Sequence, residues 1–232
     1  PEVIEQLKKK AAGDPAAMLL DVLCHEQAPV SLKILAQDSQ TPLDEVKPLL
    51  DQLISAGEIY ILKADGDPQY IAEKNIEELF DKTLHALDEY RGKYHLRRGL
   101  PDAELRSRLF PKYSAKQMAA LLNQWQAADM LQVDGAYVAV NGFHPLPTPN
   151  EEKLLAELVN AYVSSCYEPP DWQEVTGSLH IKQEDANELL IYLCDQGTLL
   201  RCGDIVYDAE RADYTETNIN GENLKLDDEV VK

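Results

Sequence analysis

The chain has 232 residues, and its 44% hydrophobic content excludes a wholly disordered protein. Its formal net charge is −19, from 41 acidic and 22 basic residues. An acidic surface repels phosphate backbones, which weighs against general coating of DNA or RNA but leaves open a local basic contact or a basic protein partner. The length allows one large domain or two to three small ones.

Self-similarity is the most informative feature of the chain. The segments LLDQLISAGEIYIL, LLNQWQAADMLQV and LLIYLCDQGTLLRC begin at Leu49, Leu121 and Leu189. In each segment, apolar residues at helical spacing lead through a chain reversal into an apolar strand. A turn and a second short strand follow, at Gln69 to Ala72, Tyr137 to Val140 and Ile205 to Tyr207. We therefore predict three copies of a helix followed by a β-hairpin.

Two further helices fit upstream of each hairpin. Their starts are predicted from N-cap residues, N1 prolines and acidic first turns. In chain order these starts are Asp14, Ser31 and Thr41-Pro42; Asn75, Pro101-Asp102 and Ser114; Thr148-Pro149, Pro169 to Trp172 and Lys182. Three helices followed by a two-stranded wing is the winged-helix order.

The predicted fold is thus mostly α with small β-hairpins (α+β), a tandem array of three winged-helix domains. We place the domains at residues 1–73, 74–142 and 147–210, with a Pro-rich linker between the last two. Residues 211–232 are polar, acidic and Asn-rich, and we expect a poorly ordered tail there.

Nothing in the sequence resembles a catalytic, metal or cofactor site. GxSxG, HExxH, P-loop and GxGxxG motifs are missing, and adjacent acids such as Glu151-Glu152 fit solvated helix faces. Cys24, Cys166, Cys194 and Cys202 form no CxxC pair, and we interpret them as buried reduced thiols. No stretch approaches the ~20 apolar residues of a membrane span, so we expect a cytoplasmic chain. Because the catalytic and cofactor motifs are missing, we also expect that it is not an enzyme and needs no cofactor. It starts without Met, which suggests a piece of a larger protein.

One basic segment, residues 91–112, departs from the acidic background. Its positive residues are Arg91, Lys93, Arg97, Arg98, Arg106, Arg108 and Lys112, against Asp102 and Glu104. The functional interpretation is a patch that grips RNA or an acidic neighbour, with Lys116 beside it. The structural interpretation is that Arg97 and Arg98 cap the long helix while Arg106 and Arg108 pair with acids of an adjoining domain. The candidate contact residues for nucleic acid or ribosome are Arg97, Arg98, Arg106, Arg108, Lys112 and Lys116.

The third helices disfavour DNA reading by all three copies. A DNA-reading helix carries Arg, Lys, Asn or Gln outward. The first copy offers Asp44 and Glu45 instead, and the third offers Glu184 and Asp185. Only the second copy, with Gln117 and Gln124 among others, suits nucleic acid.

The run YHLRRGLPDAELRSRL, residues 94–109, resembles the signature of the bacterial selenocysteine-specific elongation factor, SelB. The resemblance extends over roughly residues 14–210 and is specific in the second copy. It implies an N-terminal GTPase portion that carries selenocysteyl-tRNA, then four winged-helix domains, the last of which binds the selenocysteine-insertion hairpin in mRNA. This chain has neither the P-loop nor the fourth domain, so no hairpin-binding residue is carried over.

The resemblance makes the chain an arm between the tRNA-holding and mRNA-holding ends during UGA recoding. Its partners would be RNA and the ribosome in the full-length GTP-binding factor, with selenocysteyl-tRNA bound through missing N-terminal domains, and the chain itself is expected to be monomeric. The first two domains would form a rigid pair and the third a hinge-linked continuation. The alternatives are a tandem winged-helix DNA-binding regulator and a protein-assembly scaffold.

Overall fold

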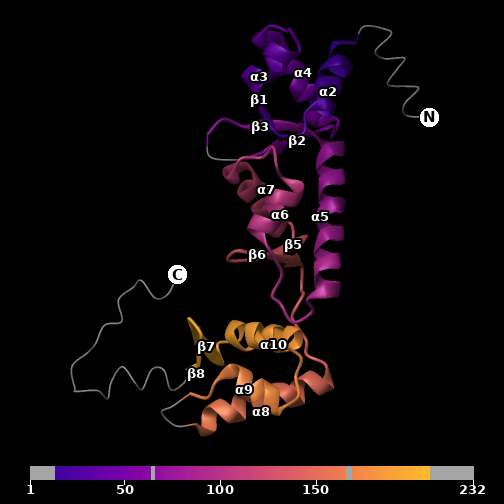
Figure 1. Cartoon of the computed structure of the whole chain (residues 1–232). Helices are drawn as coiled ribbons and strands as arrows, with labels where there is room; N and C mark the ends of the chain where they lie inside the picture. The colour runs from indigo at the N-terminus through magenta and orange to yellow at the C-terminus, as the bar shows by residue number, and fades with distance from the viewer. Residues whose placement is uncertain (1–13, 64–65, 166–168, 210–232) are drawn as a thin grey trace, which may run out of the picture. The chain divides into compact units, whose positions relative to one another are not determined.

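The computed structural model describes residues 14–63, 66–165 and 169–209 (Figure 1). These residues form two compact units: one holds the chain up to Glu89 together with Gly99–Phe143, and the other holds Tyr90–Arg98 and the chain from His144. The predicted tail, residues 211–232, lies outside the described residues. The three-domain division of the sequence stays a prediction.

The first sequence copy forms three helices and a small antiparallel sheet. Its elements are α2 (Pro15–His25), β1 (Val30–Ser31), α3 (Leu32–Asp38), α4 (Leu43–Ser55), β2 (Ile59–Leu62) and β3 (Gln69–Ala72). The strand order is β1-β3-β2, and Ile59 pairs with Ala72 across the hairpin. The core gathers fully buried side chains from all three helices, among them Leu23, Leu35 and Val46.

The second copy repeats this pattern around a longer first helix. Its elements are α5 (Glu73–Lys93), β4 (Leu100–Pro101), α6 (Asp102–Leu109), α7 (Ala115–Ala127), β5 (Leu131–Asp134) and β6 (Tyr137–Val140). The strand order is β4-β6-β5, with Val133 opposite Val138. The short strands β1 and β4 were not predicted, because two residues carry no alternation that a sequence pattern could reveal.

The third copy has α8 (Pro149–Ser164), α9 (Trp172–Ser178), α10 (Gln183–Asp195), β7 (Leu199–Cys202) and β8 (Ile205–Asp208). Within the described residues its sheet has two strands, β7 and β8. Its core contains Leu158, Tyr162 and Leu199, and also Leu96, which comes from the segment that follows α5. Helices joined to small antiparallel sheets are the predicted winged-helix arrangement; the number of such domains stays a prediction.

Most helix starts follow the predicted capping chemistry. Asp14 caps α2 ahead of Pro15, and Ser31 caps α3. Ser114 and Thr148 form capping boxes with Gln117 and Glu151, which satisfy the amides that the first helical turn leaves unpaired.

Two predicted helix starts are wrong. At α4 the N-cap is Pro42 rather than Thr41, whose hydroxyl instead donates to the Ser39 carbonyl at 3.2 Å. The long helix starts at Glu73 rather than Asn75. Asn75 lies inside that first turn, where its side-chain amide donates to the carbonyls of Leu23, Cys24 and Glu26 at 3.3, 3.2 and 2.9 Å. Asn75 therefore bonds to carbonyls that the C-terminal end of α2 leaves unpaired. Its residue type suggested an N-cap, but its role is this tertiary contact.

The reversals that end the third helices match the prediction. Gly57 and Gly197 have φ values of +73° and +68°, and Asp129 adopts +56° at the corresponding place in the second copy. A left-handed residue closes a helix with little strain only when it lacks a Cβ or is a short polar residue.

The described residues test the expectations about cysteines, metal sites and membrane spans. The interpretation of the cysteines as buried is wrong for Cys24 and Cys202, which are exposed, while Cys194 is half-buried; Cys166 lies outside the described residues. Within the described ranges there is no cluster of His, Cys, Asp or Glu suited to a metal ion. No described helix is long and apolar enough to cross a bilayer.

Candidate nucleic-acid interface

The basic segment divides into two parts with different surroundings. Residues 91–98 belong to the second compact unit with α8 and α10, whereas Gly99 to Lys112 belong to the first. The six candidate contact residues are therefore not brought into one patch. Arg97 and Arg98 lie in one unit, and Arg106, Arg108, Lys112 and Lys116 lie in the other.

Arg97 is held by a carboxylate of α10. Its Nε donates to Glu188 Oε2 at 2.8 Å and its Nη2 donates to Oε1 at 2.6 Å, so that the pair is bidentate. Its Nη1 donates to the Tyr90 hydroxyl at 2.8 Å, and the guanidinium stacks 3.9 Å from the ring centroid of Tyr94. The hydrogen bond to Glu188 raises the pKa of Arg97 above its ordinary value. Arg97 thus ties the end of the basic segment to α10.

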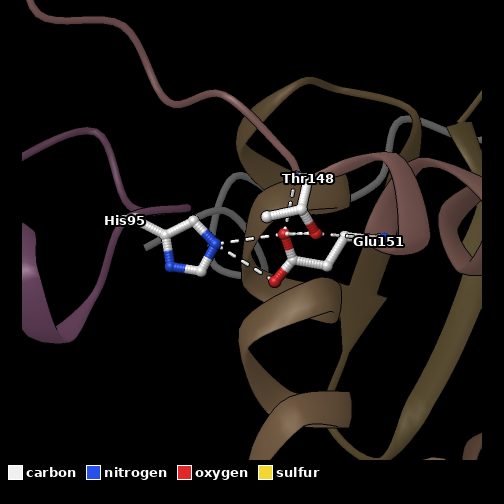
Figure 2. Close-up of polar contacts among 3 residues, drawn as sticks. All are labelled: His95, Thr148 and Glu151. Atoms are coloured by element: carbon white, nitrogen blue, oxygen red, sulfur yellow. Dashed lines mark hydrogen bonds and ion pairs between the residues drawn. The ribbon is translucent and has the colours of Figure 1, made fainter.

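Arg98 and His95 reinforce the same attachment. Arg98 Nη2 lies 3.0 Å from Asp195 Oδ1, at the last residue of α10. His95 Nε2 lies 3.1 Å from both carboxylate oxygens of Glu151 on α8, as Figure 2 shows. Glu188 and Asp195 of α10, and Glu151 of α8, therefore bind cations of the chain itself. Arg97 and Arg98 thus pair with carboxylates on α10, and Arg97 also donates to the Tyr90 hydroxyl of α5.

Glu151 serves α8 and His95 together. Its Oε2 accepts hydrogen bonds from the Thr148 backbone amide at 2.7 Å and from the Thr148 hydroxyl at 2.8 Å (Figure 2). Burial disfavours the charged carboxylate, but the bonds from Thr148 and His95 outweigh it, so the pKa of Glu151 lies below its ordinary value. The sequence-based view of Glu151 as a solvated acid missed this role, which required knowledge of where His95 folds.

Polar side chains on the third helix of the second copy, α7, also bond to other parts of the chain. Gln117 Nε2 on α7 donates to the Pro29 carbonyl at 3.0 Å and to Gln69 Oε1 at 2.7 Å. Gln124 Oε1 accepts from the Tyr60 hydroxyl at 2.6 Å. The amide side chains that looked suited to reading nucleic acid are therefore bonded to the first copy. Helix α7 does not present them to a DNA groove.

The other four candidates lie on the surface of the first unit. The exposed residues are Arg106 and Arg108 on α6, Lys112 in the loop after it, and Lys116 at the start of α7. Arg108 forms an ion pair with Glu104, one turn earlier on the same helix, and not with an adjoining domain. Among the described residues, no ion pair engages Arg106, Lys112 or Lys116. Arg108 and Lys112 line a cleft of about 570 Å³ together with His25 and Lys82.

Comparison with known proteins finds a family similarity within the second copy. Residues 84–139 match the family described as "Elongation factor SelB, winged helix". This segment is similar to a SelB winged helix.

The matched segment runs from the second half of α5 into β6 and contains all six candidate contact residues. The chain is also similar to the solved structure of the mRNA-binding domain of elongation factor SelB from E. coli in complex with SECIS RNA. That likeness has 18% sequence identity and a TM-score of 0.41, and it covers 55% of this chain and 98% of that chain. No curated protein matches the sequence.

Proposed function

We propose that the chain is the C-terminal winged-helix arm of a selenocysteine-specific translation elongation factor. In this proposal three winged-helix domains in tandem link the part that holds GTP and selenocysteyl-tRNA to the end that holds the mRNA insertion element during UGA recoding. The single observation that supports it is the SelB-type winged helix at residues 84–139, flanked on both sides by helix–hairpin copies in the same order.

The internal contacts favour an arm over an array of independent readers. Gln117 and Gln124 join the first two copies, and Phe80 of α5 packs edge-on against Trp125 of α7 with ring centroids 5.1 Å apart. The directed polar contacts resist sliding between the first two copies, and the aromatic pair holds α5 against α7 within the second. The pair would therefore move as one body and transmit displacement along the arm.

In this proposal RNA and the ribosome contact the exposed basic residues of the first unit. The arm itself has no catalytic role, needs no cofactor and acts as a cytoplasmic monomer. GTP hydrolysis and selenocysteyl-tRNA binding belong to an N-terminal portion, and specific hairpin recognition belongs to a further domain.

Deleting residues 1–232 from the encoded factor tests the arm. We expect UGA recoding in a selenocysteine reporter to be lost while GTP binding by the remaining portion is retained. Recoding that survives the deletion would contradict the proposal.

Gel shifts with the isolated chain separate the alternatives. The arm should bind the insertion-element hairpin weakly and without specificity, and tight specific binding would contradict a linking role. Binding to random duplex DNA that persists at moderate salt would instead support a DNA-binding regulator. The bonded state of Gln117 and Gln124 argues against that outcome.

A further inference from the structure

The cleft in the first unit is lined from three places in the chain. The end of α2 contributes His25, α5 contributes Glu78 and Lys82, and the stretch from α6 to α7 contributes Arg108 and Lys112. Its described lining residues carry three formal positive charges, on Lys82, Arg108 and Lys112, and one negative charge, on Glu78. A local positive excess in a chain of net charge −19 focuses the field on this cleft and away from the surrounding surface.

The cations of the cleft are available to a ligand at small cost. Lys82 lies 3.9 Å from Glu78, and the side chains are 64% and 55% exposed. The Arg108–Glu104 pair is likewise exposed, and exposed pairs contribute little stability. No ion pair engages Lys112 among the described residues, and His25 is near Asp21 rather than a cleft acid. A phosphate can therefore replace or join these weak partners.

The remaining lining suits a nucleotide better than a bare ion. Apolar side chains of Ile71, Leu79, Leu109 and Pro111 lie among the cations. A cleft of about 570 Å³ is within the size range of small-molecule sites. Cations beside an apolar surface are the combination that holds a phosphate and the sugar or base attached to it.

We propose that this cleft binds the backbone of single-stranded RNA, with Arg108 and Lys112 as the direct phosphate ligands. The inference rests on the proposed function and narrows it, since it assigns RNA contact to two of the exposed basic residues and not to Arg106 or Lys116. Arg108 can donate two parallel hydrogen bonds to one phosphate, and Lys112 supplies a mobile point charge.

The test compares two double variants of the full chain that remove the same charge. R108A/K112A empties the cleft of its direct ligands, whereas R106A/K116A removes two exposed cations outside it. The probes are a fluorescein-labelled ten-nucleotide oligouridylate, a labelled decaglutamate peptide and unlabelled pyrophosphate as competitor. Fluorescence anisotropy is read at several salt concentrations, and circular dichroism verifies that both variants are folded.

We expect R108A/K112A to weaken oligouridylate binding at least tenfold and to lower the salt slope by about 1.4, the value for two lost phosphate contacts with a single strand. R106A/K116A should weaken it less than twofold. Equal losses in the two variants would show general charge attraction and overturn the site. Tighter binding of decaglutamate would assign the cleft to a protein, and full displacement by equimolar pyrophosphate would assign it to free phosphate; either result also overturns the proposal.

RNA binding by R108A/K112A and UGA recoding after the deletion together keep this inference separate from the proposed function. If R108A/K112A binds RNA normally while deletion of residues 1–232 abolishes recoding, the cleft proposal fails and the arm stands. If R108A/K112A loses RNA binding while the deletion leaves recoding intact, the arm fails and the cleft stands.

Discussion

Arg97 combines an ion pair, a hydrogen bond and aromatic stacking in one partly buried side chain. It forms a bidentate pair with Glu188, donates to Tyr90 and stacks on Tyr94, and about 24% of its side chain is exposed. Hydrogen bonds between charged groups strengthen as water is excluded, and loss of one partner leaves the other charge uncompensated. Arg108, by contrast, is 49% exposed and pairs within one helix.

Arg97→Ala should lower the free energy of unfolding of the second unit by about 2 kcal/mol, because Glu188 would keep a partly buried charge without its partner. Arg108→Ala should lower stability by less than about 0.5 kcal/mol. Urea denaturation followed by circular dichroism compares the two variants. Similar losses from both would contradict the structural role of Arg97.

Glu151 makes the second unit sensitive to acid. The pKa of Glu151 is lowered in the folded state from its ordinary 4.5, so its carboxylate contributes stability above about pH 4.5 that is lost as the pH falls through the lowered value. The stability difference between the wild-type chain and Glu151→Gln should therefore shrink between pH 6 and pH 3 in urea titrations. Glu152→Gln, at the exposed neighbouring position, serves as the control, and a pH-independent difference for Glu151→Gln would refute the prediction.

At the scale of elements, the wing of the second copy depends on close backbone packing. Leu100 of β4 pairs with Val138 of β6, directly after Gly99. A Cβ on Gly99 would stand 2.5 Å from the Val138 carbonyl oxygen, which is backbone and cannot rotate away. The short strand β4 can form only because residue 99 has no side chain.

Gly99→Ala should destabilise the first unit by about 3 kcal/mol or more, since strands β4 and β6 would have to separate. Gly92→Ala is the matched control. Gly92 lies inside α5 with nothing within 4 Å of its would-be Cβ, and alanine there should stabilise by up to about 1 kcal/mol. Hydrogen-exchange mass spectrometry of β6 would detect the difference, and normal protection of β6 in Gly99→Ala would disprove the account.

At the scale of the whole molecule, the chain divides into two compact units, whose boundaries do not follow the three sequence copies. Helix α5 contributes its body to the first unit, whereas its end and the segment that follows, Tyr90–Arg98, belong to the second. Leu96 is 2% exposed in the core of the second unit, so this segment is part of that core and not a free linker. Each unit has buried core residues of its own, so we expect the two units to unfold separately.

Cavity variants should act on one unit at a time. Leu121→Ala in the first unit and Leu158→Ala in the second each remove a side chain with 0% exposure, and each should cost about 2–5 kcal/mol. Calorimetry should show two transitions, with Leu121→Ala lowering the temperature of one and Leu158→Ala that of the other. A single transition lowered equally by both variants would contradict independent units.

The amino-acid sequence by itself determined the local structure of this protein. Caps such as Ser114 and Thr148, the reversals at Gly57 and Gly197, and the hairpin strands depend on neighbours within a few residues, so their patterns are legible in one dimension. The basic segment and its resemblance to SelB were also legible, because both are properties of consecutive residues.

Only the tertiary structure decided what those residues do. The sequence could not say that Arg97 meets Glu188, ninety-one positions away, or that Gln117 bonds to the first copy. Charge and amide side chains bind whichever partner folding brings within about 3 Å, and long-range partners leave no periodic signal. The basic segment was therefore one feature in the sequence and two in space: an attachment to α10, and an exposed cleft at Arg108 and Lys112.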